Sequence, residues 1–453
     1  MQVKILWYII IFCLCSGVVD GQELPGDPQA QEYHKLGLFY NALFNTAVNT
    51  QLNYYNAKLY LAGRGELPRG IKRERKDHIW YYRGLCYYYQ GGLKKAIADF
   101  KRVPESSDKY FEAMIKSGAC YYKQREIKKA KGLWDKVYSK KKDNPQFLSK
   151  LGNLYAELGI NMDTAFEYCQ KKKIGKRGLV WIYLEKGKID KALSLIREID
   201  AKEPDLIDGR GEGVFSRFYD PGILKLKSLV HLRAAEKYYQ MAIKKKRNDS
   251  LCYQLGIAQL MGRRIGDSIR TLTPLTGSSK WEIKAEAKIN LGVAYYLEGT
   301  RTTANTLWNE VRQKYNNRPG PGVMSELGYI YSRLGINLNN ALSLCKEEDK
   351  LFSYYSGMAC FKKGLLENNM DYISKAPALL EKSPCDPVYL LDLSNAYYIR
   401  RDFWHATNIL MQIDSPDVKM VFDNVQGMAY AWESIALDAQ KQNWKIEWID
   451  LWY

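Results

Sequence analysis

One pattern of small, aromatic and apolar residues recurs along the chain with helical spacing. A small residue is followed by an aromatic residue three positions later, by alanine twelve positions after the small residue, and by a large apolar residue four positions beyond the alanine. The complete copies are Gly84, Tyr87, Ala96 and Phe100; Gly118, Tyr121, Ala130 and Trp134; Gly292, Tyr295, Ala304 and Trp308; and Ser394, Tyr397, Ala406 and Leu410. Gly256, Ser268 and Leu272 match without the aromatic residue. The pattern predicts closely packed helix pairs.

This pattern resembles the signature of the tetratricopeptide repeat (TPR), W-x2-L-G-x2-Y, A-x3-F and a final proline. Trp80 stands at the leading tryptophan position, and Pro204 at the proline position of a later copy. Arg83 and Ser117 depart from the signature, since both stand where leucine is expected. The resemblance implies an all-α, right-handed α-solenoid, because one helix pair cannot bury its apolar face alone and must stack on its neighbours.

The spacing of the repeats indicates a second level of order. The small reference positions are 84, 118, 152 and 180, then 256, 292, 328 and 357, so the steps are 34, 34 and 28, then 36, 36 and 29. Both third copies carry the same extra residue before their alanine, and 151–162 reads like 327–338. We therefore predict a tandem duplication of a four-repeat block, within about ten helix pairs in all.

These repeats divide the chain into segments. After a sorting signal over 1–21, we expect an N-terminal helical pair and linker (22–76), the first TPR block (77–206), a glycine-rich loop with a degenerate helical pair (207–248), the second block (249–384), a further repeat (385–416) and C-terminal capping helices (417–453). Trp444, Trp448 and Trp452 share one helical face in the last segment. They would either cover the last repeat or dock a partner.

The first 21 residues have the features of a secretory signal. Lys4 precedes an apolar run over 5–19, which is shorter than the roughly 20 residues of a membrane-spanning helix. Val19 and Gly21 are small residues placed for cleavage after Gly21. We expect an exported chain, periplasmic or secreted, with an uncleaved anchor as the alternative.

The charge balance is strongly basic. Sixty-eight Lys and Arg against 50 Asp and Glu give a net charge of +18, which favours acidic partners through long-range attraction. Several basic runs fall near expected helix ends, where they either complement helix dipoles or form a rim for a partner. The rim residues are Lys171, Lys172, Lys173, Lys244, Lys245, Lys246 and Arg247. Nucleic acid conflicts with export and is not expected, and membrane contact is expected to be peripheral only.

Residues with catalytic or metal-binding chemistry are scattered. The four histidines have no paired ligand at helical spacing, and the cysteines form no C-x-x-C pair. The seven cysteines beyond residue 21 are expected to be small buried apolar side chains rather than bridges. The repeats leave no stretch for a separate catalytic domain. We therefore expect no enzymatic activity, no cofactor and no metal.

In TPR proteins the first helix of each repeat lines a concave groove. The resemblance places there Tyr81, Tyr88, Tyr122, Arg177, Trp181, Tyr253, Tyr296, Tyr329, Tyr354 and Tyr398. Tyrosine offers a large contact area and a hydrogen-bonding tip, which suits an extended peptide, a helix or a sugar chain. Packing between repeats is the equal alternative for these residues. Tyr81 and Leu85 stand where carboxylate-gripping TPR co-chaperones have Lys and Asn, so that activity is not implied.

Two functions remain open at this stage. The first is a non-enzymatic TPR scaffold in the cell envelope, which holds a protein or peptide partner, acidic in character, in its groove. The alternative is a binding or assembly module for an anionic polysaccharide export system.

Overall fold

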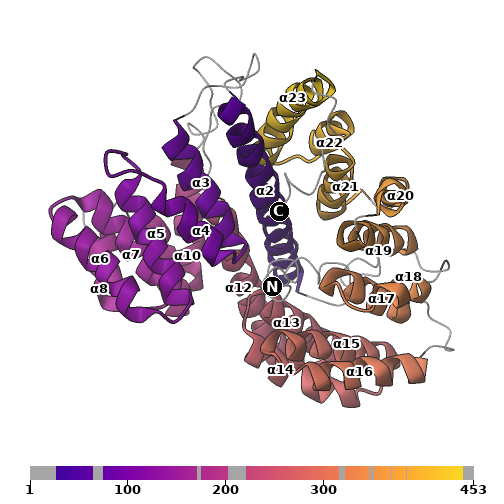
Figure 1. Ribbon diagram of the computed structural model, residues 1–453. Helices are drawn as coiled ribbons and strands as arrows, with labels where there is room; N and C mark the ends of the chain where they lie inside the picture. The colour runs from indigo at the N-terminus through magenta and orange to yellow at the C-terminus, as the bar shows by residue number, and fades with distance from the viewer. Residues whose placement is uncertain are drawn as a thin grey trace. The chain divides into compact units, whose positions relative to one another are not determined.

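The computed structural model describes residues 27–64, 75–170, 175–202, 221–315, 322–345, 347, 351–367, 369–383 and 385–441. The regular secondary structure of these residues is entirely helical (Figure 1), which confirms the all-α prediction. The expected sorting signal, Lys171 to Lys173, the glycine-rich loop and Trp444, Trp448 and Trp452 lie outside the described residues.

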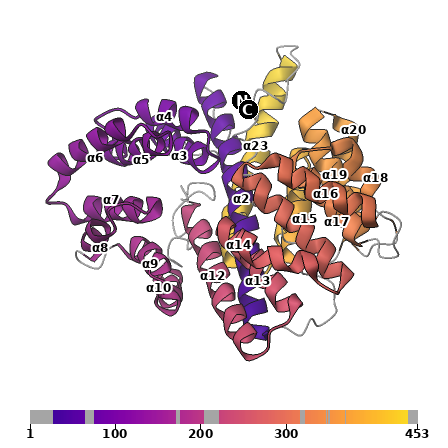
Figure 2. The ribbon, with the colours of Figure 1, turned by 90° about the horizontal axis from the view of Figure 1, so that it is seen from below.

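Helices of the first block pack in sequential pairs. The pairs are α3 (Lys76–Tyr89) with α4 (Leu93–Lys101), α5 (Tyr110–Lys123) with α6 (Ile127–Lys141), α7 (Pro145–Leu158) with α8 (Met162–Gln170), and α9 (Lys176–Glu185) with α10 (Ile189–Lys202). The first helix of each pair, called here the A helix, also contacts the A helix of the next pair. This is the stacking expected of a solenoid, and Figure 2 shows the pairs side by side.

The second block and the repeat after it follow the same plan. The pairs are α13 (Asp249–Met261) with α14 (Ile265–Leu272), α15 (Trp281–Glu298) with α16 (Arg301–Tyr315), α17 (Gly322–Leu334) with α18 (Leu338–Leu344), α19 (Phe352–Glu367) with α20 (Met370–Leu380), and α21 (Pro387–Ile399) with α22 (Phe403–Leu410). Short 3-10 turns follow two of them, η4 (Thr273–Gly277) and η5 (Pro416–Val418).

The turn within a pair repeats one backbone conformation. In eight of the nine described pairs, the residue seven positions after the small reference position has a positive φ. Glycine adopts this conformation without steric cost and fills five of these turns. Arg125, Arg263 and Arg401 fill the other three, with φ of 66°, 63° and 71°. The turn is thus set by the two helices rather than by glycine alone.

The second repeats of the two blocks have the same side-chain packing. Trp134 lies against Gly118 and donates its indole N–H to the backbone carbonyl of Ile115, with 3.1 Å between nitrogen and oxygen. Trp308 lies against Gly292 in the same way and donates to the carbonyl of Ile289 at 3.0 Å. The rings of Tyr122 and Trp134, and those of Tyr296 and Trp308, are both 6.0 Å apart at 39°. Corresponding repeats of the two blocks therefore share their internal packing.

The prediction of a helical pair is wrong for two segments of the chain. Residues expected to form a pair near the N-terminus form one helix, α2 (Pro28–Arg64). Its middle is rich in Asn and Thr, but the Thr50 hydroxyl donates to the Thr46 carbonyl within the helix and both side chains are buried. The degenerate pair expected after the glycine-rich loop is likewise one helix, α12 (Gly222–Lys245). Both helices continue without interruption where a turn between two helices was expected.

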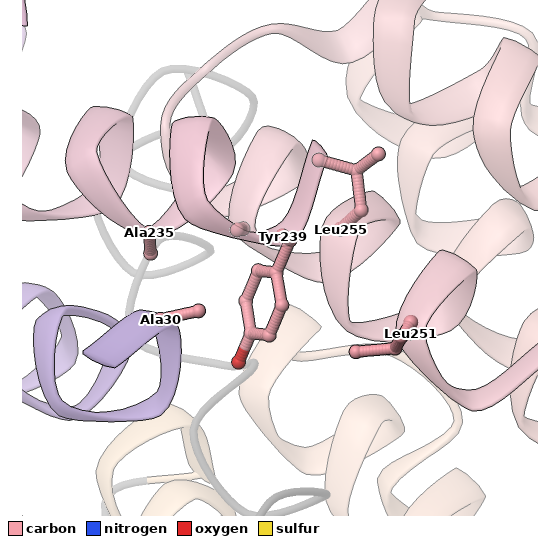
Figure 3. Close-up of a cluster of buried hydrophobic side chains, with 6 residues drawn as sticks. Ala30, Ala235, Tyr239, Leu251 and Leu255 are labelled. Atoms are coloured by element: carbon pink, nitrogen blue, oxygen red, sulfur yellow. The ribbon is translucent and has the colours of Figure 1, made fainter. Parts of the chain in front are cut away.

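The chain separates into two units. The first unit consists of Phe44–Leu226 with Asp414–Tyr453, and the second of Met1–Leu43 with Lys227–Ile413. In the first unit the last described helix, α23 (Lys419–Lys441), packs Gly427 against the ring of Tyr54 in α2. In the second unit the Tyr239 ring of α12 lies among Ala30 of α2 and Leu251 of α13 (Figure 3). Long single helices therefore cover the repeats in both units.

The predicted burial of the cysteines is confirmed for six of the seven. Cys86, Cys120, Cys169, Cys252, Cys345 and Cys360 are buried, whereas Cys385 is exposed, and none of the seven forms a disulfide within the described residues. Burial raises the pKa of the Cys120 and Cys169 thiols to about 12, so these thiols stay protonated and unreactive. None of the described helices combines the length and the apolar character that crossing a bilayer requires.

Candidate binding groove

A groove of about 720 Å³ runs along the A helices of the first unit. Its lining comes from α3, α5, α7 and α9, together with α10 and the start of α12. The lining repeats in register, because Tyr82, Lys116 and Lys150 each lie two positions before the small residue of successive repeats. Stacking of equivalent helices thus places equivalent side chains in one row.

Glu157 lies at the floor of this groove. Its carboxylate accepts a hydrogen bond from the Tyr88 hydroxyl at 3.1 Å and pairs with the Nζ atoms of Lys116 at 3.3 Å and Lys225 at 3.6 Å. Burial by itself would raise the pKa of this carboxyl. The charges of Lys116, Lys225 and Lys123 and the bond from Tyr88 outweigh burial and hold the pKa well below its usual range. Glu157 is therefore ionised at neutral pH.

A second carboxylate, Glu112, links three repeats. It accepts a hydrogen bond from the Tyr81 hydroxyl at 3.0 Å, and it pairs with Lys150 of the following A helix. Lys109 lies 3.5 Å from the same carboxylate. The predicted groove residues Tyr81 and Tyr88 are buried, so their rings pack between repeats while their hydroxyls orient the two carboxylates.

Several lysines lie close to aromatic rings in and around the groove. Lys123 and Lys116 lie 4.0 Å and 4.9 Å from the centre of the Tyr88 ring, and Lys225 lies 5.7 Å from that of Trp181. These distances are within reach of cation–π attraction. The lysine side chains are thereby held at the wall with their ammonium groups directed by the rings.

The far end of the groove combines charge with accessible aromatic surface. Lys176 pairs with Glu198 at 2.7 Å, and Arg177 and Trp181 are half-buried. The sequence prediction placed both Arg177 and Trp181 in a groove, and the structure brings them together with Tyr81 in its lining. Their partial exposure leaves them able to contact a bound molecule.

The charges that line the groove are predominantly positive. The lining contains Lys116, Lys150, Lys176, Arg177 and Lys225 against Glu112, Glu157 and Glu198. Each of the three carboxylates is already paired with at least one lysine. An added anionic group would therefore meet an excess of positive charge beside aromatic surface.

The predicted groove tyrosines of the second unit are mostly buried. Tyr253, Tyr329, Tyr354 and Tyr398 are at most 3% exposed, and they pack between helices. The Tyr354 hydroxyl donates to Asp392 at 2.7 Å, and Arg333 pairs with the same carboxylate at 2.7 Å. Tyr253, Tyr329 and Tyr354 therefore serve as internal hydrogen-bonding groups of the second unit.

Groove charges change sign between the two blocks. Lys150 corresponds to Glu326, and Glu157 corresponds to Arg333, by their distance from the small residue of the third repeat. Glu286, which corresponds to Glu112, therefore neighbours a carboxylate instead of a lysine. Burial, followed by the charges of Glu326 and Glu282, raises the pKa of Glu286 well above its usual value. The duplicated scaffold thus carries two different electrostatic interiors.

The remaining predicted site residues lie elsewhere. Tyr122 and Tyr296 are half-buried against Trp134 and Trp308. Lys244, Lys245, Lys246 and Arg247 are exposed at the end of α12 in the second unit and are not part of the groove lining.

One cluster has the residue types of a metal site. Ligand atoms of Asp77, His78 and Asp108 lie within 4.8 Å of one another. However, His78 Nε2 bonds Asp108 at 2.7 Å, and Arg75 lies 2.7 Å from Asp77 and 3.6 Å from Asp108. The Arg75 guanidinium already supplies the positive charge between the two carboxylates, so the cluster fits an ion-pair network better than a cation site.

Sequence reasoning missed the charged centre of the groove. Glu157, Lys116 and Lys225 were not among the predicted groove residues, although Lys116 and Glu157 occupy A-helix positions at fixed distances from Gly118 and Gly152. Comparing all residue types at equivalent A-helix positions, and not only tyrosine, would have identified Lys116 and Glu157. Lys225 comes from α12, which lies outside the repeats, so no register predicts it.

Comparison with known proteins gives structural matches at low sequence identity. No family model matches the sequence, and no curated protein matches it. The crystal structure of yeast Tom70 is similar over 80% of this chain and 96% of that chain, with 13% sequence identity and a TM-score of 0.31. The Cut9–Hcn1 hetero-tetramer of APC/C is similar over 83% of each chain, with 14% identity and a TM-score of 0.28. Function is therefore inferred from the groove itself.

Proposed function

We propose that this chain is a non-enzymatic scaffold that holds a segment of a protein partner in the groove of the first unit. The observation that carries the proposal is the groove lining, in which cations outnumber carboxylates and aromatic side chains are also present. Such a lining recognises a segment with acidic and apolar side chains, because ammonium groups attract the former and the rings of Trp181 and Tyr82 contact the latter.

The protonation state of the groove supports binding rather than catalysis. A general base works best when its pKa lies near the operating pH. Lysine charges hold the pKa of Glu157 far below that range, and Lys150 and Lys109 neutralise Glu112. Both carboxylates orient lysines and connect helices, and the low pKa of Glu157 makes it a poor general base.

We also propose that the scaffold acts outside the cytoplasm, in the cell envelope. The apolar run over 5–19 and the small residues Val19 and Gly21 support this location. N-terminal sequencing of the protein from its source cells should start at or near Gln22. A chain that starts at Met1 in the cytosolic fraction would exclude this location without affecting the groove.

Capture of partners with matched variants tests the groove. The chain from Gln22 onward carries either Lys150→Glu with Trp181→Ala in the groove, or Lys244→Glu at the exposed end of α12 as a charge-matched control. We expect an acidic protein to be retained by the native chain and the control but lost from the groove variant. Retention that is equal in all three would contradict the proposal. Capture of an anionic polysaccharide in place of a protein would favour the alternative function.

A further inference from the structure

The outer helix α6 of the first unit carries a dense set of lysines away from the groove. Its last helical residue is Lys141, and Lys142 follows as the C-cap. The basic residues of this segment are Lys128, Lys129, Lys131, Lys136, Lys140, Lys141 and Lys142, against the single acid Asp135. Six of these seven lysines are exposed, Lys141 being half-buried. At 3.6 residues per turn the exposed lysines cover about half of the helix circumference.

Helix electrostatics do not account for this arrangement. Lys140 and Lys141 lie in the last turn, where they complement the helix dipole. Lys128 and Lys129 lie in the first turn, where a positive charge is unfavourable and where the helix contains no acidic residue. Lys129 pairs with the carboxylate of the N-cap residue Glu126. Lys136 and Lys140 are also like charges four residues apart, an arrangement that weakens a helix slightly. The lysines of α6 are therefore present at some cost to the helix.

The duplicated block shows that the fold does not need these lysines. Helix α16 is the counterpart of α6. Both helices have 15 residues, and each contains a tryptophan that lies against the glycine of the preceding A helix. The positions of Lys128, Lys129, Lys131 and Lys136 are occupied in α16 by Thr302, Thr303, Asn305 and Glu310. The same backbone and the same core packing thus accept neutral or acidic side chains at these positions.

Exposed basic residues also occur on the outer helix of the preceding repeat, and exposed apolar residues occur on α6. On α4, the outer helix of the preceding repeat, Lys94, Lys95 and Lys101 are exposed, and so is Arg102 directly after it. On α6, Ile127 is 50% exposed and Tyr138 is 43% exposed. Ile127 and Tyr138 are eleven residues apart, which places them on the same side of the helix, next to the lysines. Figure 1 shows α6 at the edge of the first unit.

We propose that this lysine surface of α4 and α6 binds the anionic headgroups of a lipid bilayer. Lysine is a flexible point charge that needs no fixed geometry in its partner, and the lysines here are spread along exposed helix positions instead of lining the groove. A plane of lipid headgroups meets such a surface at many points, and each lysine near an anionic bilayer contributes about 1 kcal/mol. Ile127 and Tyr138 would contact the interface between headgroups and acyl chains.

Co-sedimentation with lipid vesicles tests this surface with the full chain from Gln22 onward. The test variant, Lys128→Thr, Lys129→Thr, Lys131→Asn and Lys136→Glu, carries the residues of α16 at the same positions. A control variant carries Lys244→Thr and Lys245→Thr on α12. Vesicles of phosphatidylcholine with phosphatidylglycerol provide the anionic surface, and pure phosphatidylcholine vesicles the neutral one. Thermal unfolding followed by circular dichroism verifies that all variants fold.

We expect the native chain and the control to bind the anionic vesicles at low salt, and the α6 variant to bind at least about tenfold more weakly. Equal binding by the α6 variant, or no binding by the native chain, would overturn the proposal. Binding to soluble polyphosphate but not to anionic vesicles would also overturn it, in favour of a polyanion. The groove variant with Lys150→Glu and Trp181→Ala should still bind vesicles, so a failure of the groove proposal remains distinguishable.

Discussion

The indole ring of Trp134 lies directly against the backbone of Gly118, at a separation that no side chain on residue 118 permits. The indole N–H passes beside this glycine to the carbonyl of Ile115. The smallness of Gly118 is therefore what allows α6 to approach α5 and what gives the tryptophan its hydrogen-bonding partner.

Gly118→Ala should destabilise the first block. The added methyl group would overlap the Trp134 indole, which is only 6% exposed and has no free space to move into. We expect a loss of about 1–3 kcal/mol in the free energy of unfolding, as for other overpacked cores. Urea unfolding followed by tryptophan fluorescence measures it, and an unchanged transition would refute the packing described here.

Gly132→Ala should have the opposite effect in the same helix pair. Gly132 is an exposed residue within α6, and nothing lies within 4 Å of the position that a methyl group would occupy. Alanine has a higher helix propensity, so we expect about 0.5–1 kcal/mol of stabilisation. The same urea experiment makes this variant a control for Gly118→Ala, and a loss of stability would contradict the exposed placement of Gly132.

Glu157→Gln should lower stability at neutral pH and remove part of its acid dependence. Because the folded-state pKa is depressed, ionised Glu157 stabilises the fold above its ordinary pKa of 4.5, and this contribution is lost as the pH falls toward the folded-state pKa. The unfolding temperature of the variant should lie below that of the native chain at pH 7 and approach it in acid. Glu198→Gln is the control, since its pair with Lys176 is half exposed and should contribute little.

Equivalent glutamates of the two blocks should respond to the same substitution with opposite signs. Glu286 has a raised pKa, so the native fold loses stability as the pH rises from 4.5 toward the folded-state value. Glu286→Gln should therefore raise the unfolding temperature at pH 7. Glu112→Gln breaks the pair with Lys150 and should lower it. A decrease in both variants would disprove the charge inversion between the blocks.

Binding kinetics should separate charge from contact area in the groove. Arg177→Glu with Lys150→Glu should slow association with an acidic partner, and this effect should shrink at high salt because the Debye length falls from about 10 Å at 0.1 M to about 3 Å at 1 M. Trp181→Ala should mainly speed dissociation, with little dependence on salt. Rates measured by surface plasmon resonance at two salt concentrations would refute this division if charge reversal left association unchanged.

Sequence periodicity predicts the repeats well because their packing is local. Gly118, Ala130 and Trp134 belong to one helix pair, so their spacing alone predicts their contact. Periodicity does not predict the long helices α2 and α12. Polar residues such as Asn41 and Lys227 are buried in them, although the sequence suggests surface or turn positions. The groove was predicted by its aromatic residues, whereas the buried fraction of Tyr253, Tyr329 and Tyr354 depends on how closely successive A helices stack. That property has no signature in a single repeat.

The hydrogen bond from Tyr88 to Glu157 joins α3 to α7 and passes over the repeat between them. In a solenoid held only by contacts between adjacent repeats, each repeat can open with little effect on those further away. Here the opening of α7 also breaks the hydrogen bond between Tyr88 of α3 and Glu157. It breaks the ion pair between Glu157 and Lys116 of the intervening α5 as well. Local opening in the first block is thereby made cooperative, so amide hydrogens of α3, α5 and α7 should exchange with solvent together rather than in order from one end.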